Sequence, residues 1–217
     1  MVQFPGFSPD DFDIFLIPDF HERMFRIRSR LRPKLAQLGD DIAPALLFSD
    51  HPLYPHTASH ARRRVNPPND TWVAFSRSPR GYKRFAHFEI GIDRHQVFVR
   101  FVVKPEGVDD KPHLLAYLRQ AGADAFRLSD PEPIYWYRDD HGQSFQAISR
   151  LDDQAVATIA DATAKKSRGF AVGMALARDQ AVVASAQLVA KSINMITHLA
   201  PLYVHTVTSE PVASSHG

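Results

Sequence analysis

The first 40 residues carry the periodicity of α-helices. Ser8 stands before Pro9 and two acidic residues, a combination typical of a helix start. Apolar residues then recur every three or four positions and predict a longer amphipathic helix: Phe20, Met24, Ile27, Leu31, Leu35 and Leu38. Pro33 must kink this helix or begin a new turn, because proline cannot donate to the carbonyl four residues back. Gly39 is the expected C-terminal end.

From residue 71 the pattern changes to the alternation of half-buried strands. Residues 71–75 are strand-like, and two alternating runs at 88–92 and 97–103 flank Asp93 and Arg94, which predicts a β-hairpin. Before them, Pro55 could open a short helix over residues 56–64. That helix must stop near Val65, because Pro67 disfavours helical backbone at the residue before it.

The second half of the chain alternates between helical and strand patterns. We expect helices at about 110–121, 151–165 and 180–199, and strands at 134–137, 145–148 and 170–176. Because the strands form hairpins rather than βαβ units, the sequence predicts an α+β fold with a mainly antiparallel sheet packed against several helices. A single domain is expected over residues 1–207, followed by a disordered tail at 208–217.

The composition narrows the class of protein. The length of 217 residues corresponds to one domain or at most two. Cysteine is absent, which excludes disulfides, zinc–thiolate sites and cysteine nucleophiles. The chain has no run of 18 apolar residues and does not begin like a signal peptide, so we expect a cytoplasmic protein with no membrane span.

The small net charge of +2 hides an uneven distribution. Residues 1–104 hold 16 Lys and Arg against 11 Asp and Glu, whereas residues 105–217 hold 10 against 13. The excess lies in residues 23–34, with six bases and no acid, and in residues 62–84, with seven bases and only Asp70. A GC-rich coding sequence would explain the number of arginines but not their clustering. In the first stretch, Arg23, Arg26, Arg30 and Lys34 line one flank of the apolar face. Acids from elsewhere or an anionic partner could offset these like charges, or the flank is simply a solvated helix edge.

The densest chemistry lies in a block of motifs between residues 56 and 91. The chain reads HTASHARRRVNPPNDTWVAF at 56–75, RGYK at 80–83 and HFEIG at 87–91. This block resembles the signature of the YktB family, small bacterial proteins of unknown function, and the likeness spans most of residues 1–104. Ser59, Arg64 and Glu89 depart from the family pattern, and Glu89 adds an ionisable group beside His87. The resemblance implies an α+β fold and a cytoplasmic location, but no activity.

The histidines permit more than one interpretation. If residues 56–64 were helical, His56, His60 and Arg63 would share one face. Two histidines four residues apart can bind a metal, and His87 or Glu89 could complete the site. Arg63 would repel the cation, however, so we predict no metal. The simpler interpretation is that hydrogen bonds satisfy these histidines at a sheet edge.

Charged pairs in the block also allow a structural and a functional interpretation. The consecutive arginines 62–64 could offset a helix dipole, and one of them could pair with Asp70 to fix the turn at residues 66–70. His87 and Glu89 lie two apart on one face of a strand. They are either a general acid–base pair or the polar face of a half-buried strand.

The loop near residues 77–84 combines cations with an aromatic ring, as nucleotide and single-strand binding sites do. The chain contains no P-loop, no GxGxxG and no GxSxG, and we predict no cofactor. The favoured hypothesis is a module that binds a phosphate-bearing ligand, either a nucleotide or a nucleic acid. Its candidate ligand-binding residues are Arg62, Arg63, Asn66, Arg80, Tyr82 and Lys83.

Two alternatives stay open. The block could be the site of an acid–base enzyme with phosphoester chemistry, whose candidate catalytic residues are His56, His60, Asp70, His87 and Glu89. The basic face could instead dock an acidic protein partner, because cationic surfaces attract acidic ones.

Overall fold

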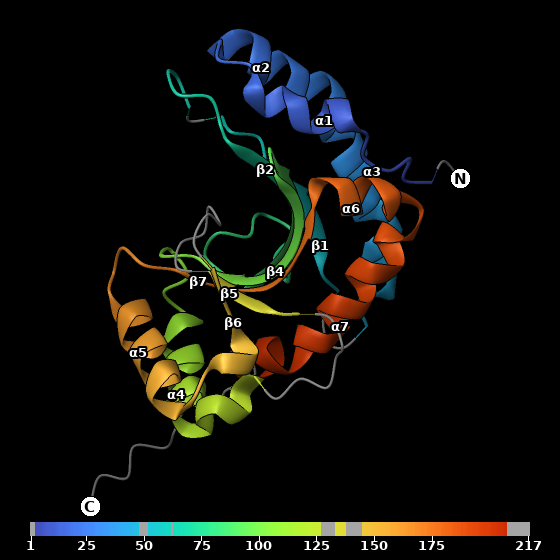
Figure 1. The fold of residues 1–217 in the computed structure, drawn as a ribbon. Helices are drawn as coiled ribbons and strands as arrows, with labels where there is room; N and C mark the ends of the chain where they lie inside the picture. The colour runs from blue at the N-terminus through green and yellow to red at the C-terminus, as the bar shows by residue number, and fades with distance from the viewer. Residues whose placement is uncertain (1–2, 48–51, 62, 127–132, 138–144, 208–217) are drawn as a thin grey trace, which may run out of the picture.

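A single antiparallel sheet forms the centre of the molecule (Figure 1). The computed structural model describes residues 3–47, 52–61, 63–126, 133–137 and 145–207. Seven strands follow in the order β1-β2-β3-β4-β7-β5-β6, and every neighbouring pair is antiparallel. Their bounds are β1 Tyr54–Thr57, β2 Asp70–Ser76, β3 His87–Asp93, β4 Gln96–Val103, β5 Tyr135–Tyr137, β6 Phe145–Ala147 and β7 Phe170–Ala177.

The helices lie against one face and at the ends of this curved sheet (Figure 1). They are α1 Pro9–Asp13, α2 Phe20–Arg26, α3 Arg32–Ile42, α4 Lys111–Ala121, α5 Asp153–Ala164, α6 Arg178–Val183 and α7 Leu188–Val207. α3 packs on β1 and β2, whereas α7 packs on β3, β4 and β7. The predicted α+β architecture is therefore confirmed. No helix in the described part of the chain is long and apolar enough to cross a membrane.

The alternation along the strands separates two faces with different chemistry. The side chains that point toward the helices are apolar and join the main core, among them Val73, Phe75, Phe88, Ile90, Val99 and Phe101. The positions between them point to the opposite face, where buried ionisable and small side chains gather: Asp70, Ala74, His87, Glu89, Arg100 and Gly173. The second face therefore carries the polar chemistry of the sheet.

The predicted longer helix, which contains Pro33, is interrupted as the proline requires. A π-helical turn at Ile27–Leu31 joins α2 to α3, and Pro33 lies in the first turn of α3, where its missing N–H is tolerated. The prediction that Gly39 ends the helix is wrong, because α3 continues to Ile42. A Cβ on Gly39 would lie 3.0 Å from side-chain atoms of both Pro55 and Val73. Glycine is needed there for close approach of the helix to the sheet.

Two other predicted helices differ from the structure. The expected helix at residues 56–64 is wrong, because β1 pairs with β2 and places His56 opposite Ala74. Pro55 fits this strand, since β1 is at the sheet edge and its ladder is one-sided. The helix expected at 180–199 is two helices, α6 and α7, separated by a 3-10 turn at Ser185–Gln187.

The β3–β4 hairpin is confirmed, and an aspartate replaces the usual glycine in its turn. Asp93 Oδ1 accepts hydrogen bonds from the backbone N–H groups of His95 and Gln96, at 2.6 and 3.0 Å. The Asp93 side chain thus satisfies two backbone N–H groups of the turn, which therefore needs no glycine. The strand at β7 and the helices at α4 and α5 also lie where the sequence predicts them. The tail at 208–217 lies outside the described residues.

Candidate functional pocket

A cavity of about 590 Å³ lies between β1 and the loop that joins β2 to β3, residues 77–86, called here the pocket loop. The side chains that carry chemistry in its lining are His56, Arg80, Tyr82, Lys83 and Arg84. Four of the predicted site residues therefore meet in one place: His56, Arg80, Tyr82 and Lys83. β1 contributes the histidine, and the pocket loop contributes the cations and the phenol ring.

One buried carboxylate holds both ends of the pocket loop. Asp110 accepts two hydrogen bonds from the Arg77 guanidinium, each 2.8 Å long, and a third of 2.6 Å from the backbone N–H of Ala86. The Arg77 guanidinium also lies over the Phe85 ring, 4.6 Å from its centroid. Since Arg77 begins the loop and Ala86 ends it, Asp110 fixes the span that the loop must cross.

The wall of the pocket is aromatic. The Tyr82 ring lies 6.0 Å from the His56 ring and 5.0 Å from the His87 ring, measured between centroids. Burial raises the pKa of Tyr82 to about 12, so the phenol stays protonated at neutral pH and can donate a hydrogen bond. His56 Nε2 lies 2.8 Å from the Ser78 carbonyl oxygen. Because a carbonyl only accepts, His56 donates from Nε2, and Nδ1 of the neutral ring keeps its lone pair.

The charge around the pocket is positive. Arg80 and Lys83 are exposed, and neither forms an ion pair with a described residue. Arg84 approaches Asp109 at 3.7 Å, but both side chains are largely in solvent, where such a pair is weak. The described residues that line the cavity include no carboxylate. The pocket thus presents three cations whose charge nothing in its lining offsets.

A buried charged cluster lies behind Tyr82 on the second face of the sheet. Glu89 Oε1 is 3.1 Å from His87 Nε2 and 3.0 Å from Lys104 Nζ. Burial would raise the pKa of Glu89, but the Lys104 charge and the hydrogen bond from His87 outweigh it and lower the pKa to about 2. Glu89 is therefore an ionised carboxylate with two partners. His87 and Glu89 are both buried, whereas the sequence pattern suggests the polar face of a half-buried strand.

Other predicted site residues do not line the pocket. His60 Nε2 lies 3.2 Å from Thr71 Oγ1, and its ring packs edge-on against Trp72 at 5.5 Å. Burial lowers the pKa of His60 to about 4. Asn66 is exposed, and Asp70 is buried at the start of β2. None of the three, nor Arg63, belongs to the lining of the cavity.

The predicted roles of the arginines 62–64 are not decided by the structure. Arg62 lies outside the described residues, so its part in the site and a pairing of the arginines 62–64 with Asp70 stay predictions. In the part of the chain that the structure describes, no three His, Asp or Glu side chains converge as metal ligands would.

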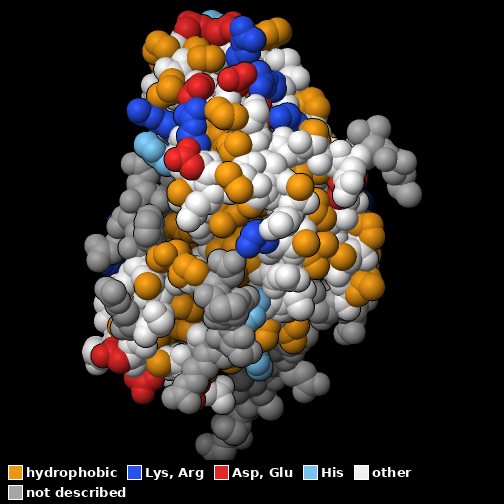
Figure 2. All heavy atoms as spheres, turned by 45° about the vertical axis from the view of Figure 1, so that its right-hand side comes forward, with side chains coloured by type: hydrophobic (Ala, Val, Ile, Leu, Met, Phe, Trp, Pro, Cys, Tyr) orange, Lys and Arg blue, Asp and Glu red, His pale blue; other side chains and the backbone are white. Residues whose placement is uncertain are grey.

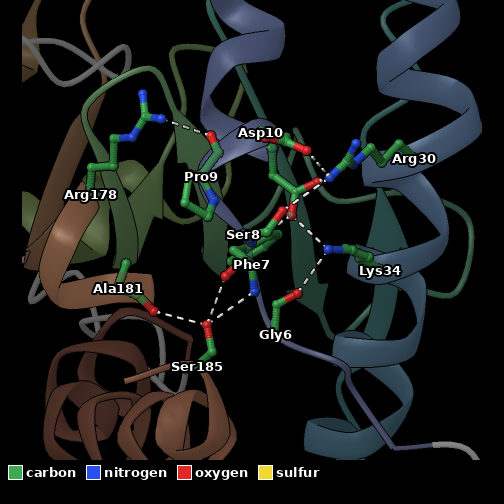
Figure 3. Close-up of polar contacts among 11 residues, drawn as sticks. Gly6, Phe7, Ser8, Pro9, Asp10, Arg30, Lys34, Arg178, Ala181 and Ser185 are labelled. Atoms are coloured by element: carbon green, nitrogen blue, oxygen red, sulfur yellow. Dashed lines mark hydrogen bonds and ion pairs between the residues drawn. The ribbon is translucent and has the colours of Figure 1, made fainter. Parts of the chain in front are cut away.

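Part of the other basic stretch, residues 23–34, is paired with acids from elsewhere in the chain. Asp11 receives Lys34 at 2.6 Å and Arg30 at 2.7 Å, and these two cations point toward the N-terminal segment (Figure 3). Arg23 is buried and donates to backbone carbonyls of Ile17 and Pro68. Figure 2 shows the same mixture at the top of the molecule, where acidic and basic side chains are interspersed. Arg23, Arg30 and Lys34 of this stretch therefore have a structural role.

Sequence reasoning missed three residues of the site region: Asp110, Lys104 and Arg100. Asp110 precedes a helix and resembles an ordinary N-cap, yet its side chain forms no cap hydrogen bond and serves the pocket loop instead. Arg100 lies in β4 and Lys104 directly follows this strand, four positions after Arg100, so their parity could have placed them on the face of His87 and Glu89. The Arg100 guanidinium lies between the Phe98 and Tyr137 rings, 3.7 and 4.0 Å from their centroids.

Comparison with known proteins identifies the family. The model of the domain of unknown function DUF1054 matches residues 7–203. A UPF0637 protein of Bacillus cereus (strain G9842) is 33% identical over 204 residues, which cover 91% of this chain and 95% of that protein. A UPF0637 protein of Bacillus thuringiensis (strain Al Hakam) is 32% identical with the same coverage. The chain therefore belongs to the DUF1054 family of YktB-like bacterial proteins, as the motifs at residues 56–91 predict.

Proposed function

We propose that the pocket binds a small phosphate-bearing ligand such as a nucleotide. The observation that carries this proposal is the placement of Arg80 and Lys83 at a cavity whose described lining has no carboxylate. Arginine offers a planar fork for two phosphate oxygens, and lysine adds a point charge with three donors. Because both side chains are free of described ion pairs, a bound phosphate would not have to displace an internal partner.

The volume of the pocket favours a small ligand over a nucleic acid strand. Pockets for drug-sized molecules enclose about 300–1,000 Å³, and this cavity of about 590 Å³ falls within that range. A strand would need a longer basic track. Lys34 and Arg30 of residues 23–34 are not available for such a track, since Asp11 already pairs with both.

The remaining lining suits the rest of a nucleotide. Tyr82 offers a ring face and a protonated hydroxyl, which can contact a base or a ribose. A Cβ added at Gly81 would meet no atom within 4 Å, so the backbone there is open to a ligand. Asp110 supports this lining indirectly, because it fixes the two ends of the loop that carries it.

Calorimetric titration with ADP, inorganic pyrophosphate and adenosine tests the proposal. We expect ADP and pyrophosphate to bind and adenosine to bind far more weakly. The variant Arg80→Ala with Lys83→Ala should raise the Kd for ADP at least about tenfold, since each charge-assisted contact contributes about 1.5–3 kcal/mol. Arg94→Ala is the matched control, because Arg94 is an exposed arginine outside the pocket. Absence of ADP and pyrophosphate binding, or equal effects of the two variants, would refute the proposal.

A second candidate function uses the same pocket and rests on the orientation of His56. With Nε2–H held by the Ser78 carbonyl, a neutral His56 has a basic Nδ1 and can act as a general base. In phosphoester hydrolysis it would take the proton of the attacking water while the ester P–O bond breaks. Turnover of p-nitrophenyl phosphate that His56→Gln abolishes, with ADP affinity unchanged, would support an enzyme. If the protein does not turn over this phosphoester, only the binding module is left as a candidate.

A further inference from the structure

His87 lies behind Tyr82 with no exposed surface, and both of its ring nitrogens face acceptors. Nδ1 lies 2.7 Å from the Phe85 carbonyl oxygen, and Nε2 lies 3.1 Å from Glu89 Oε1. A carbonyl oxygen has no proton to donate. Glu89 has none either, because Oε1 also receives Lys104 Nζ at 3.0 Å and its pKa is lowered to about 2.

A neutral imidazole can satisfy only one of these two contacts. It carries a single N–H, so its second nitrogen would turn a lone pair toward an oxygen lone pair. An unsatisfied contact of this kind is costly in a buried site. We therefore propose that His87 is an imidazolium, protonated on both nitrogens, which positions the pocket loop and supplies the positive charge behind the pocket wall.

The charged groups around His87 are consistent with a second proton. Glu89 faces it from its own strand, and Tyr82 faces it from the pocket loop. Lys104 approaches Glu89 from the residue after β4, and Arg100 lies opposite Glu89 on β4. The positions opposite His87 on the neighbouring strands are the neutral Ser76 and Val102. The Tyr82 and His87 rings are in edge-to-face contact, with 5.0 Å between their centroids. His87, Glu89 and Lys104 together then hold one positive charge in excess.

The second proton connects the buried cluster to the proposed ligand site. Phe85 belongs to the pocket loop, so the bond to its carbonyl fixes the loop through a charged donor, stronger than a neutral one. The excess charge lies directly behind Tyr82, which lines the cavity. Its effect on ligand affinity rests on the proposed function, whereas the protonation state does not.

Nitrogen NMR of the histidine side chains tests the protonation state on the intact chain. At pH 7.5, where an unperturbed imidazole is mostly neutral, we expect both His87 nitrogens to show imidazolium shifts and bound protons. The His87 signals are assigned through their contact with the Tyr82 ring protons. His95, exposed in the hairpin turn, is the internal reference. A neutral His87 tautomer at this pH would overturn the inference.

The variant His87→Gln separates charge from hydrogen bonding, because a glutamine amide retains donors but no charge. With the fold verified by its thermal transition, we expect the Kd for ADP to rise about fivefold, as for the loss of one nearby charge in a partly solvated site. Unchanged ADP affinity in a folded variant would contradict the charged role. If wild-type protein binds no ADP, the proposed function fails, and the NMR result alone decides on the imidazolium.

Discussion

Two basic regions of this protein have similar composition and different roles. Residues 23–34 hold six bases without an acid, and Asp11 from another segment binds two of them, Lys34 and Arg30. The pocket loop places Arg80 and Lys83 at a cavity where no described residue pairs with them. The difference lies in the carboxylates that the fold brings near each cluster. Asp11 pairs with two bases of the first, whereas near the second Asp110 binds Arg77 and Glu89 binds Lys104, and neither pairs with Arg80 or Lys83. Clustering alone therefore does not identify a ligand site.

The two regions are also attached to the rest of the fold by different side chains. In the N-terminal region Ser185 accepts from the Phe7 N–H and donates to the Phe7 carbonyl, which attaches the segment to the C-terminal helices (Figure 3). In the pocket region Asp110 attaches both loop ends to the start of α4. In each region a side chain that is distant in sequence, Ser185 or Asp110, forms these attaching hydrogen bonds.

The largest effect should come from breaking the attachment of the pocket loop. Asp110→Ala leaves Arg77 and the Ala86 N–H without their acceptor, and we expect it to lower the free energy of unfolding by about 3 kcal/mol, as for a broken buried pair. Urea denaturation measures this value. Lys83→Ala, an exposed change in the same loop, is the control and should stay within about 0.5 kcal/mol. A mild effect of Asp110→Ala would mean that the loop does not depend on this carboxylate.

The corresponding change in the N-terminal region should destabilise the fold without touching the pocket. Asp11→Ala removes a fully buried carboxylate that binds Lys34 and Arg30, and the expected cost is about 2 kcal/mol, reduced because both cations are partly exposed. The affinity for ADP should not change. Loss of ADP binding in a folded Asp11→Ala protein would contradict the assignment of a purely structural role to Arg30 and Lys34.

Acid should weaken the fold through His60 and through Asp11 over different pH ranges. The pKa of His60 is lowered to about 4 by burial, so between about pH 6.5 and 4 the unfolded chain binds the extra proton and stability falls as pH falls. The pKa of Asp11 is also lowered; burial would raise it, but Lys34 and the Ser8 N–H outweigh burial. Its contribution is present above the unfolded pKa of about 4 and is lost below it.

Urea denaturation of the wild type and of His60→Gln, each at pH 7 and pH 5, measures how much His60 contributes to the pH dependence of stability. We expect the stability of the wild type to drop by about 1–2 kcal/mol more than that of the variant over this interval. Asp11→Asn is the companion control and should leave the change between pH 7 and pH 5 unaltered. An identical change in wild type and His60→Gln would show that His60 is not buried in its neutral form.

The smallest effect should come from the exposed flank of the first basic region. Arg26 pairs with Glu22 at 2.7 Å, but both side chains are about half exposed. Exposed i,i+4 pairs contribute about 0.3–0.5 kcal/mol, so Arg26→Ala should shift the unfolding free energy by no more than that. A loss above about 1 kcal/mol would show that this pair belongs to the Asp11 network rather than to the solvated surface.

Local patterns predicted most of the elements because they encode burial directly. The alternation at 88–92 and 97–103 predicted the hairpin, and Pro33 predicted the break between α2 and α3. The same reasoning failed at residues 56–64, where local spacing allowed a helix but pairing with β2 made His56 part of a strand. It failed at Gly39 for a similar reason, because the close contact is with Pro55 and Val73 from the sheet.

The sequence by itself determined the α+β class, the order of most elements and the family, because hydrophobic periodicity and contiguous motifs are local properties of the chain. It also brought forward His56, Arg80, Tyr82 and Lys83 as candidates. Only the tertiary structure decided which cations keep their charge available, since Asp11 and Asp110 reach their partners from 19 to 33 positions away. Electrostatic pairing depends on distance in space, and separation along the chain does not reveal it.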